Sequence, residues 1–246
     1  PAEHEVVTTF QGLVDDTPFL AQMKLMLDTL EEAMNTPVDV EFAHDGQDFY
    51  LLQCRPQAQT GDAAPVPIPR DIKDQDLLFN ARRYVSNGWV PDITHIIYVD
   101  AEAYAGLSGR EAMLEVGRAV GHLNEILPKR QFILVGPGRW GTRDPFIGIP
   151  VNWSQISNAK VIVETSLDEF PLDASLGSHF FHNLTSMNVG YFAINQIGNA
   201  DKINWEKLLS LPCAGSTNYL RHIYLDRPLF IQMDGGKRVG TIHYKA

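Results

Sequence analysis

The sequence predicts an α/β protein, α+β overall, in which a small helix–hairpin unit precedes a layered domain with a mixed, largely parallel sheet. Three observations support this prediction. An amphipathic helical pattern followed by two turn-linked strand patterns comes first, a proline-rich stretch follows, and helical and strand patterns then alternate along the rest of the chain. We therefore expect a first domain over residues 1–57, a linker over 58–70 and a second domain over 71–246.

The first unit begins with an expected amphipathic helix over 17–35. Pro18 suits the first helical position. The strand-like runs VDVEFA (38–43) and DFYLLQCR (48–55) follow, joined by HDGQ with its Asp-Gly turn signal. This segment predicts a helix packed on a β-hairpin. The helix would bury one stripe of residues, namely Phe19, Met23, Met26, Leu27 and Leu30.

The second domain is expected to contain helices and strands in alternation, followed by an antiparallel C-terminal edge. The edge is predicted by the runs YLRHIYLD, PLFIQMD and RVGTIHYK, with Asp234-Gly235-Gly236 as a turn. The patterns predict helices at 72–86, 108–127, 152–158, 176–188 and 203–210, and strands at 93–100, 131–136, 160–165 and 190–195.

The composition limits the class of protein. At 246 residues, 44% hydrophobic and 20% charged, the chain is long enough to bury substantial cores. Its net charge of −10 and lack of a Lys/Arg cluster argue against a nucleic-acid or anionic-membrane partner. The sequence shows no membrane-length apolar run or signal peptide, and the two cysteines lie far apart, so we expect a cytoplasmic protein. Because the chain starts at Pro1, we expect it to be a piece of a longer polypeptide.

The predicted hairpin carries four polar residues within apolar runs. Strand alternation puts Asp39 and Glu41 on one face of the first strand, and Gln53 and Arg55 on one face of the second. Two carboxylates, an amide oxygen and a guanidinium are groups that a divalent cation and a phosphate chain would need. The alternative is a solvated face of a half-buried hairpin.

The turn decides whether these four residues can act together. A plain two-residue turn at Asp45-Gly46 would pair position 41 with 50, and would put Glu41 and Gln53 on opposite faces. An odd loop or a bulge would instead pair 41 with 51 and 39 with 53, so that all four groups share one face. We predict the odd loop, on the hypothesis that these groups act together.

Asp39-x-Glu41 followed by Gln53-x-Arg55-Pro56, behind a helix, resembles the C-terminal end of the ATP-grasp nucleotide-binding domain of the phosphoenolpyruvate synthase and pyruvate phosphate dikinase family. The resemblance covers roughly residues 17–57. It implies that Glu41 and Gln53 are Mg²⁺ ligands that bridge to the ATP phosphates. It further implies that Arg55 contacts the phosphates as the catalytic residue, and that Asp39 lies in the same cofactor-binding site.

The resemblance also implies a longer parent enzyme, an ATP-dependent phosphotransferase acting on pyruvate or another small acceptor. The N-terminal ATP-grasp lobe of the family has no counterpart in this sequence, so we expect this chain to be inactive alone. None of the eight histidines lies in the Gly-Gly-x-Thr-x-His-Ala context of the family's phosphorylated histidine. Residues 71–246 are expected to form an accessory α/β domain of unknown function.

A second candidate site lies in the stretch FILVGPGRWGTRDPFIGIPVNW, where a predicted strand runs into a loop of glycines and arginines. Ligands bind at the carboxyl ends of strands in α/β sheets, so this loop could bind an anion, and the chain could be a non-catalytic anion- or nucleotide-binding regulatory module. Alternatively, the glycines only turn the chain and Arg139 pairs with Asp144. The residues of this candidate site are Gly136, Gly138, Arg139 and Arg143.

Three further residues are given structural roles. His179 and His182 are spaced to share a ligand, but no third and fourth metal donor stands at a suitable spacing, so a hydrogen-bonded core pair is the favoured interpretation. Cys213 is expected to be a buried hydrophobic residue.

Overall fold

The computed structural model describes residues 9–35, 37–56, 65–69, 71–82, 85, 87–166, 179–195 and 201–244. The chain divides into two compact units, residues 1–58 and 59–246. The expected linker at 58–70 lies partly outside the described residues. Its described part, residues 65–69, packs within the second unit, where the Val66 amide donates to the Met233 carbonyl at 3.4 Å.

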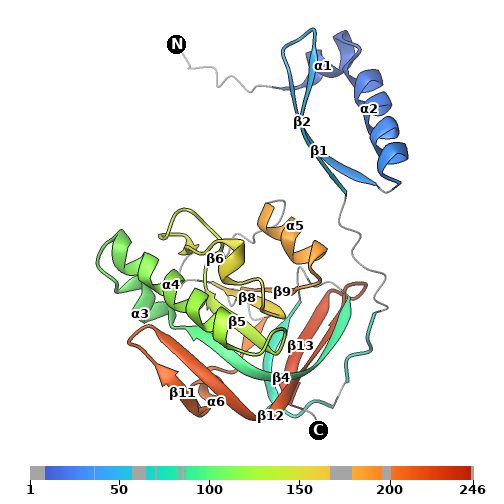
Figure 1. Cartoon of the computed structure of the whole chain (residues 1–246). Helices are drawn as coiled ribbons and strands as arrows, with labels where there is room; N and C mark the ends of the chain where they lie inside the picture. The colour runs from blue at the N-terminus through green and yellow to red at the C-terminus, as the bar shows by residue number, and fades with distance from the viewer. Residues whose placement is uncertain are drawn as a thin grey trace, which may run out of the picture. The chain divides into compact units, whose positions relative to one another are not determined.

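The first unit consists of two helices and a hairpin (Figure 1). Phe19 on α2 packs against Phe42 and Phe49 of the hairpin, with ring centroids 5.6 and 6.0 Å apart. Helix α2 ends at Asn35, which takes the left-handed conformation common after a helix. The expected helix and hairpin are confirmed, whereas α1 was not predicted. The elements are α1 (Gln11–Asp16), α2 (Phe19–Met34), β1 (Val38–His44) and β2 (Phe49–Pro56).

The second unit is built on one large mixed sheet with the strand order β10-β3-β13-β12-β4-β5-β8-β9, and β11 pairs with β12. Strands β4, β5, β8 and β9 run parallel, and the other pairings are antiparallel. A separate parallel pair is formed by β6 (Arg139–Trp140) and β7 (Gly148–Ile149). The strands of the large sheet are β3 (Leu77–Ala81), β4 (Gly88–Val99), β5 (Phe132–Pro137), β8 (Val161–Thr165), β9 (Gly190–Ile194), β10 (Lys202–Ile203), β11 (Cys213–Ser216), β12 (Leu220–Asp234) and β13 (Val239–Tyr244).

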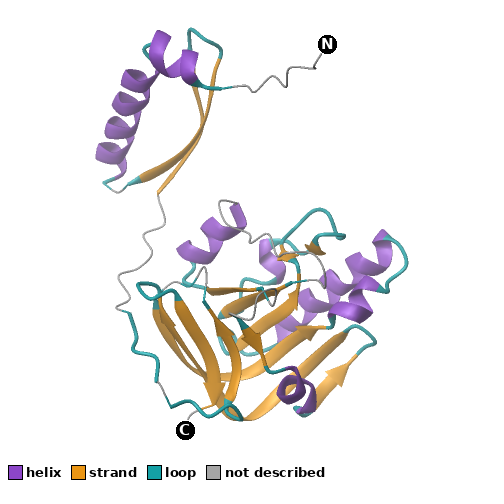
Figure 2. Cartoon of the chain, turned by 180° about the vertical axis from the view of Figure 1, so that it is seen from behind, coloured by secondary structure: helices purple, strands orange, loops and turns teal. Residues whose placement is uncertain are grey.

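The longer helix α4, together with α3 and α5, covers one face of this sheet, while the sheet curls around a second core on its other face, to which α6 contributes Leu208 (Figures 1 and 2). The first core joins Val116 and Val120 of α4 to Leu134 of β5. In the second core, Gly240 of β13 lies so close to Phe192 of β9 that a Cβ there would be 2.6 Å from the ring. The helical elements are α3 (Ala101–Ala105), α4 (Arg110–Ile126), η1 (Trp153–Gln155), α5 (His179–Ser186) and α6 (Trp205–Ser210).

The predicted α/β class with a mixed sheet is confirmed, but the antiparallel part is much larger than an edge. The expected helix at 72–86 is wrong, because Leu77–Ala81 forms strand β3 between β10 and β13. The helix expected at 152–158 is only the short 3₁₀ turn η1. The runs expected as separate strands at 219–226 and 228–234 form one strand, β12, whose pairing with β4 is irregular between Tyr224 and Leu229.

A histidine pair joins β4 to β12 near the middle of the sheet. His95 Nδ1 and His222 Nε2 lie 3.0 Å apart and the Tyr224 ring packs on His95. Burial lowers the pKa of both imidazoles, and the neighbouring His222 lowers that of His95 further. In the folded protein the pair therefore favours the state in which neither ring is charged.

We expect this pair to make the protein less stable in mild acid. Because both folded pKa values lie below the ordinary value near 6.5, the stabilisation is complete above about pH 6.5 and is lost as the pH falls through the folded values. The pair is partly solvated, so the loss should be on the order of 1 kcal/mol at most. The melting temperature, measured from pH 8 to 5, should fall more steeply with decreasing pH in the wild type than in the double variant His95→Gln/His222→Gln. The exposed His122→Gln is the control, and an unchanged slope in the double variant would contradict the expectation.

Candidate functional site

The four polar hairpin residues share one face of the β1–β2 ribbon. Glu41 pairs directly with Gln53, and Asp39 pairs with Arg55. The register shifts between Glu41 and Phe42, which pairs with Leu51, so Leu52 is the extra residue of a bulge. The four groups converge as expected, but through this bulge: the predicted odd loop is wrong, and the expected partners were two residues off. The loop itself, between the paired residues His44 and Phe49, has an even number of residues.

The loop conformation depends on the side chain of Asp45. One carboxylate oxygen accepts from the amides of Gln47 and Asp48 at 2.9 and 2.8 Å, and the other accepts from the Tyr50 hydroxyl at 2.9 Å. These contacts, with the Asp48 amide first, lower the pKa of Asp45 to about 2. Asp45-Gly46, which the sequence marks as a turn, therefore begins a four-residue loop held by Asx-type hydrogen bonds, and it does not form a two-residue turn.

The two faces of the hairpin differ in what covers them. The apolar face packs against α2 through the Phe19 contacts described above and through Cys54, whose Sγ lies 3.6 Å from Sδ of Met34. The polar face points away from α2, where Asp39 and Glu41 are exposed and Gln53 and Arg55 are half-buried. The site is thus a platform, backed by one helix, with its functional groups open on the other side.

Arg55 lies between the two groups expected to bind the metal. Its Nη2 donates to Oε1 of Gln53 and lies 3.8 Å from Oε1 of Glu41. The guanidinium therefore places a positive charge beside an amide oxygen and a carboxylate oxygen on neighbouring strands. This arrangement shows that the two oxygens can face a common cationic group.

The glycine-rich loop after β5 is a tightly packed structural turn. A Cβ on Gly138, which has a φ of +64°, would lie 2.4 Å from the Ile147 carbonyl oxygen, and one on Gly136 would lie 2.6 Å from Cδ1 of Ile149. The Arg143 side chain is exposed and its carbonyl accepts from Arg110 at 3.1 Å. Close packing accounts for both glycines, and anion binding at 136–144 stays a prediction.

The remaining candidate residues do not assemble a site. His182 Nε2 lies 3.3 Å from the Ser186 hydroxyl, while the side chain of His179 lies outside the described residues. The expectation for Cys213 is wrong, because it is exposed on the edge strand β11, with Sγ 2.9 Å from the Gly215 carbonyl. In the part of the chain that the structure describes, no three His, Cys, Asp or Glu side chains are close enough to hold a metal ion.

Sequence patterns missed a pocket of about 750 Å³ in the second unit, between the segment around Ile72 and strands β12 and β13. Trp89, at the start of β4, lines this pocket and is exposed, but its exposure cannot be read from the sequence. Its strand neighbours in the sheet come from the C-terminal part of the chain, so no local pattern could reveal the pocket.

A helix-backed hairpin whose open face carries carboxylates, an amide and a guanidinium has the groups of a nucleotide-phosphate platform. Residues 5–76 match the family model described as pyruvate phosphate dikinase, AMP/ATP-binding domain. The match includes the hairpin and ends within the second unit. No curated protein matches the chain.

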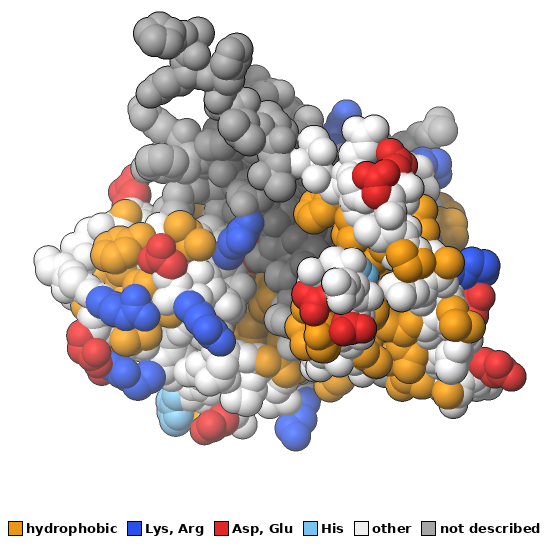
Figure 3. Space-filling view, turned by 90° about the horizontal axis from the view of Figure 1, so that it is seen from above, with side chains coloured by type: hydrophobic (Ala, Val, Ile, Leu, Met, Phe, Trp, Pro, Cys, Tyr) orange, Lys and Arg blue, Asp and Glu red, His pale blue; other side chains and the backbone are white. Residues whose placement is uncertain are grey.

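On the face drawn in Figure 3, basic and acidic side chains are interspersed and form no extended basic field among the residues shown in colour. None of the helices in the described ranges is long and apolar enough to cross a membrane.

Proposed function

We propose that the β1–β2 hairpin supplies the Mg²⁺ and phosphate ligands of an ATP site in a phosphoenolpyruvate synthase-like phosphotransferase. The observation that supports this most directly is the register of the hairpin. It pairs Glu41 with Gln53 and Asp39 with Arg55 on the face that α2 leaves open. The family match over residues 5–76 supports the same assignment.

The groups present suit magnesium. Mg²⁺ in phosphoryl-transfer sites is usually held by one or two protein oxygens, with the phosphates and water completing its coordination. Glu41 and Gln53 offer one oxygen each on adjacent strands, and the guanidinium of Arg55 already lies against both. When bound there, the ion would neutralise charge on the β- and γ-phosphate oxygens.

Two of the hairpin residues would position the phosphates, one directly and one indirectly. Arg55 would leave Gln53 for the phosphate oxygens, where a planar guanidinium can donate two parallel hydrogen bonds. Asp39, directly opposite Arg55 in the register, would hold the guanidinium in position. Catalysis of this kind depends on positioning and on charge stabilisation, both of which a rigid hairpin provides.

A second ATP-grasp lobe would cover the open face of the hairpin, and pyruvate or another small acceptor would receive the phosphoryl group. The second unit would be an accessory domain. The enzyme would act in the cytoplasm, where its two cysteines would remain reduced.

Paramagnetic broadening tests this proposal on the chain itself. Mn²⁺ is added as a probe for Mg²⁺ together with a non-hydrolysable ATP analogue. We expect the amide resonances of Glu41, Gln53 and their strand neighbours to broaden first. Glu41→Ala should weaken the effect by about tenfold or more, since a charged ligand contact contributes roughly 1.5–3 kcal/mol.

The matched control is Asp28→Ala, which removes an exposed carboxylate that pairs with Lys24 on α2. It should leave the broadening unchanged. Equal broadening of α2 and the hairpin, or an unchanged effect in Glu41→Ala, would contradict the proposal.

A further inference from the structure

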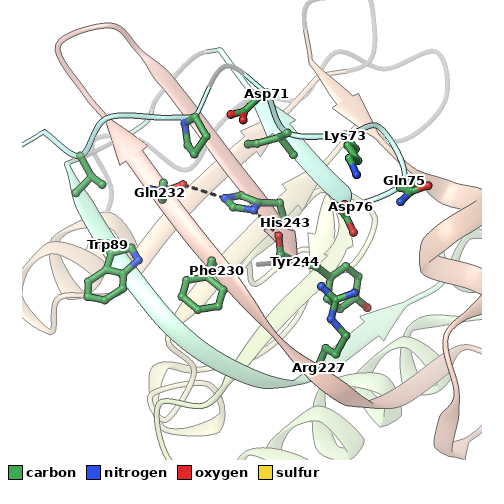
Figure 4. A pocket seen from close by; sticks show the side chains of 13 residues that line it. Asp71, Lys73, Gln75, Asp76, Trp89, Arg227, Phe230, Gln232, His243 and Tyr244 are labelled. Atoms are coloured by element: carbon green, nitrogen blue, oxygen red, sulfur yellow. Dashed lines mark hydrogen bonds between the residues drawn. The ribbon is translucent and has the colours of Figure 1, made fainter. Parts of the chain in front are cut away.

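The pocket of about 750 Å³ in the second unit has the size of a small-molecule site, for which roughly 300–1,000 Å³ is usual. Its floor is the outer surface of β12 and β13, and the segment on either side of Ile72 forms its rim (Figure 4). All residues that line the pocket belong to the second unit, residues 59–246, so the pocket is a different site from the hairpin.

One side of the pocket is aromatic. Trp89 of β4 and Phe230 of β12 lie next to each other, with ring centroids 6.4 Å apart and ring planes inclined by 30° (Figure 4). Trp89 is 55% exposed although it is the largest apolar side chain in the lining. A partly exposed aromatic pair on a pocket wall can receive a planar ring by offset stacking.

The other side of the pocket is charged. Lys73, Asp76 and Arg227 gather there, away from Trp89 (Figure 4). The Arg227 guanidinium lies over the Tyr244 ring, 5.3 Å from its centroid, and this contact positions it at the pocket. Asp71 also lines the pocket, so the described lining residues offer carboxylates as well as basic groups.

The floor between the two sides is polar and ordered. His243 is only 7% exposed, and its two ring nitrogens lie 2.8 Å from the Tyr244 carbonyl and 2.9 Å from Oε1 of Gln232. The Gln232 amide nitrogen donates to the Pro67 carbonyl at 3.3 Å, which ties the rim segment to the sheet. The floor of the pocket is thus fixed by hydrogen bonds that join β12 to β13 and to the rim segment.

We propose that this pocket binds a small zwitterion that carries an aromatic ring, the chemistry of an aromatic amino acid. The ring would lie against Trp89 and Phe230, and the carboxylate would reach Arg227 and Lys73. The ammonium would face Asp76 or Asp71. A ligand with only an anionic group would satisfy the basic residues but would face these carboxylates, so both charges on the ligand are needed.

The test uses three matched compounds: L-phenylalanine, 3-phenylpropionate, which lacks the amine, and phenethylamine, which lacks the carboxylate. Each is titrated into the full chain without ATP or Mg²⁺ and is followed by saturation-transfer NMR. We expect L-phenylalanine to bind about tenfold more tightly than either truncated compound, because each loses one charge-assisted contact. The Arg227→Ala variant should bind L-phenylalanine no more tightly than it binds phenethylamine. The Trp89→Ala variant should bind all three compounds more weakly than the wild type does.

Two exposed residues outside the pocket provide matched controls: Arg118→Ala on α4 and Phe146→Ala. Neither should change binding, and neither should Arg55→Ala in the hairpin, which separates this test from that of the ATP site. The proposal is overturned if none of the compounds gives a binding curve that reaches saturation, or if 3-phenylpropionate binds as tightly as L-phenylalanine. It is also overturned if Arg227→Ala behaves like Arg118→Ala, or if AMP binds in a manner that depends on Trp89.

Discussion

Gly148→Ala is expected to destabilise the second unit by about 3 kcal/mol or more. This value lies at the upper end of the destabilisation usually caused by adding atoms to a packed region. A Cβ on Gly148 would lie 2.0 Å from the carbonyl oxygen of Arg139 and 2.3 Å from its nitrogen. Both are backbone atoms, so no side chain can rotate away to make room. The β6–β7 pair, in which Arg139 and Gly148 are direct partners, would have to separate.

The separation would also break contacts that hold the loop to α3. The Tyr104 hydroxyl donates to the carbonyls of Pro145 and Gly148 at 2.9 and 2.8 Å. Burial raises the pKa of this tyrosine, with a smaller contribution from Asp144, so the hydroxyl remains a donor at any ordinary pH. Backbone movement at Gly148 would leave that buried hydroxyl with fewer partners, which adds to the cost.

Thermal unfolding measures this effect. For a unit of this size, 3 kcal/mol corresponds to a lower melting temperature by roughly 6–12 °C. Gly215→Ala is the matched control, because Gly215 lies on β11 and a Cβ there would have no atom within 4 Å. The free energy of unfolding of Gly215→Ala should stay within about 0.5 kcal/mol of the wild-type value. Equal melting temperatures for the two variants would show that β6 and β7 do not approach this closely.

The glycine-rich loop shows a limit of sequence reasoning. The spacing of Gly136, Gly138 and Arg139 after a buried strand is equally compatible with an anion-binding loop and with close backbone packing. Only the distances to Ile147 and Ile149, which follow later in the chain, reveal the packing. A glycine pattern alone identifies a backbone constraint, without identifying what imposes it.

The hairpin was predictable because the information that specifies it is local. Alternation along β1 and β2 places Asp39 with Glu41 and Gln53 with Arg55 before any tertiary contact is known. Convergence of the groups was inferred from the sequence, but the odd loop predicted to produce it is wrong. The structure uses a bulge at Leu52, and the position of that bulge could not be obtained from the sequence. That position depends on how α2 and the loop at Asp45 fix the register.

Strand β3 was missed for the opposite reason. The run around Leu78 and Phe79 has apolar residues that fit a helical stripe, and nothing nearby in the sequence contradicts a helix. Both side chains are buried, and the strand pairs with β13 and with β10, which lie more than a hundred residues away. Tertiary pairing therefore overrides the local preference, and the pocket beside β13 was missed with it.

Glu164→Ala is expected to cost about 3–5 kcal/mol, the range for leaving buried donors without a partner and for creating a cavity. Glu164 lies on strand β8, between β5 and β9, and is fully buried. One carboxylate oxygen accepts from the Trp140 amide at 2.9 Å, and the other accepts from the Tyr191 hydroxyl. The side chain therefore links β6, β8 and β9, and alanine would remove the acceptor from both donors.

Glu164→Gln separates this explanation from a simple loss of volume. Its amide oxygen can still accept from Trp140, and its NH₂ group can donate to Tyr191, because a hydroxyl can reverse its role. We expect the glutamine variant to lose about 1–2 kcal/mol, clearly less than the alanine variant. The measurement is urea unfolding of both variants and of Tyr191→Phe. If glutamine and alanine cost the same, the hydrogen bonds to Trp140 and Tyr191 do not stabilise this part of the sheet, and Glu164 would contribute through packing alone.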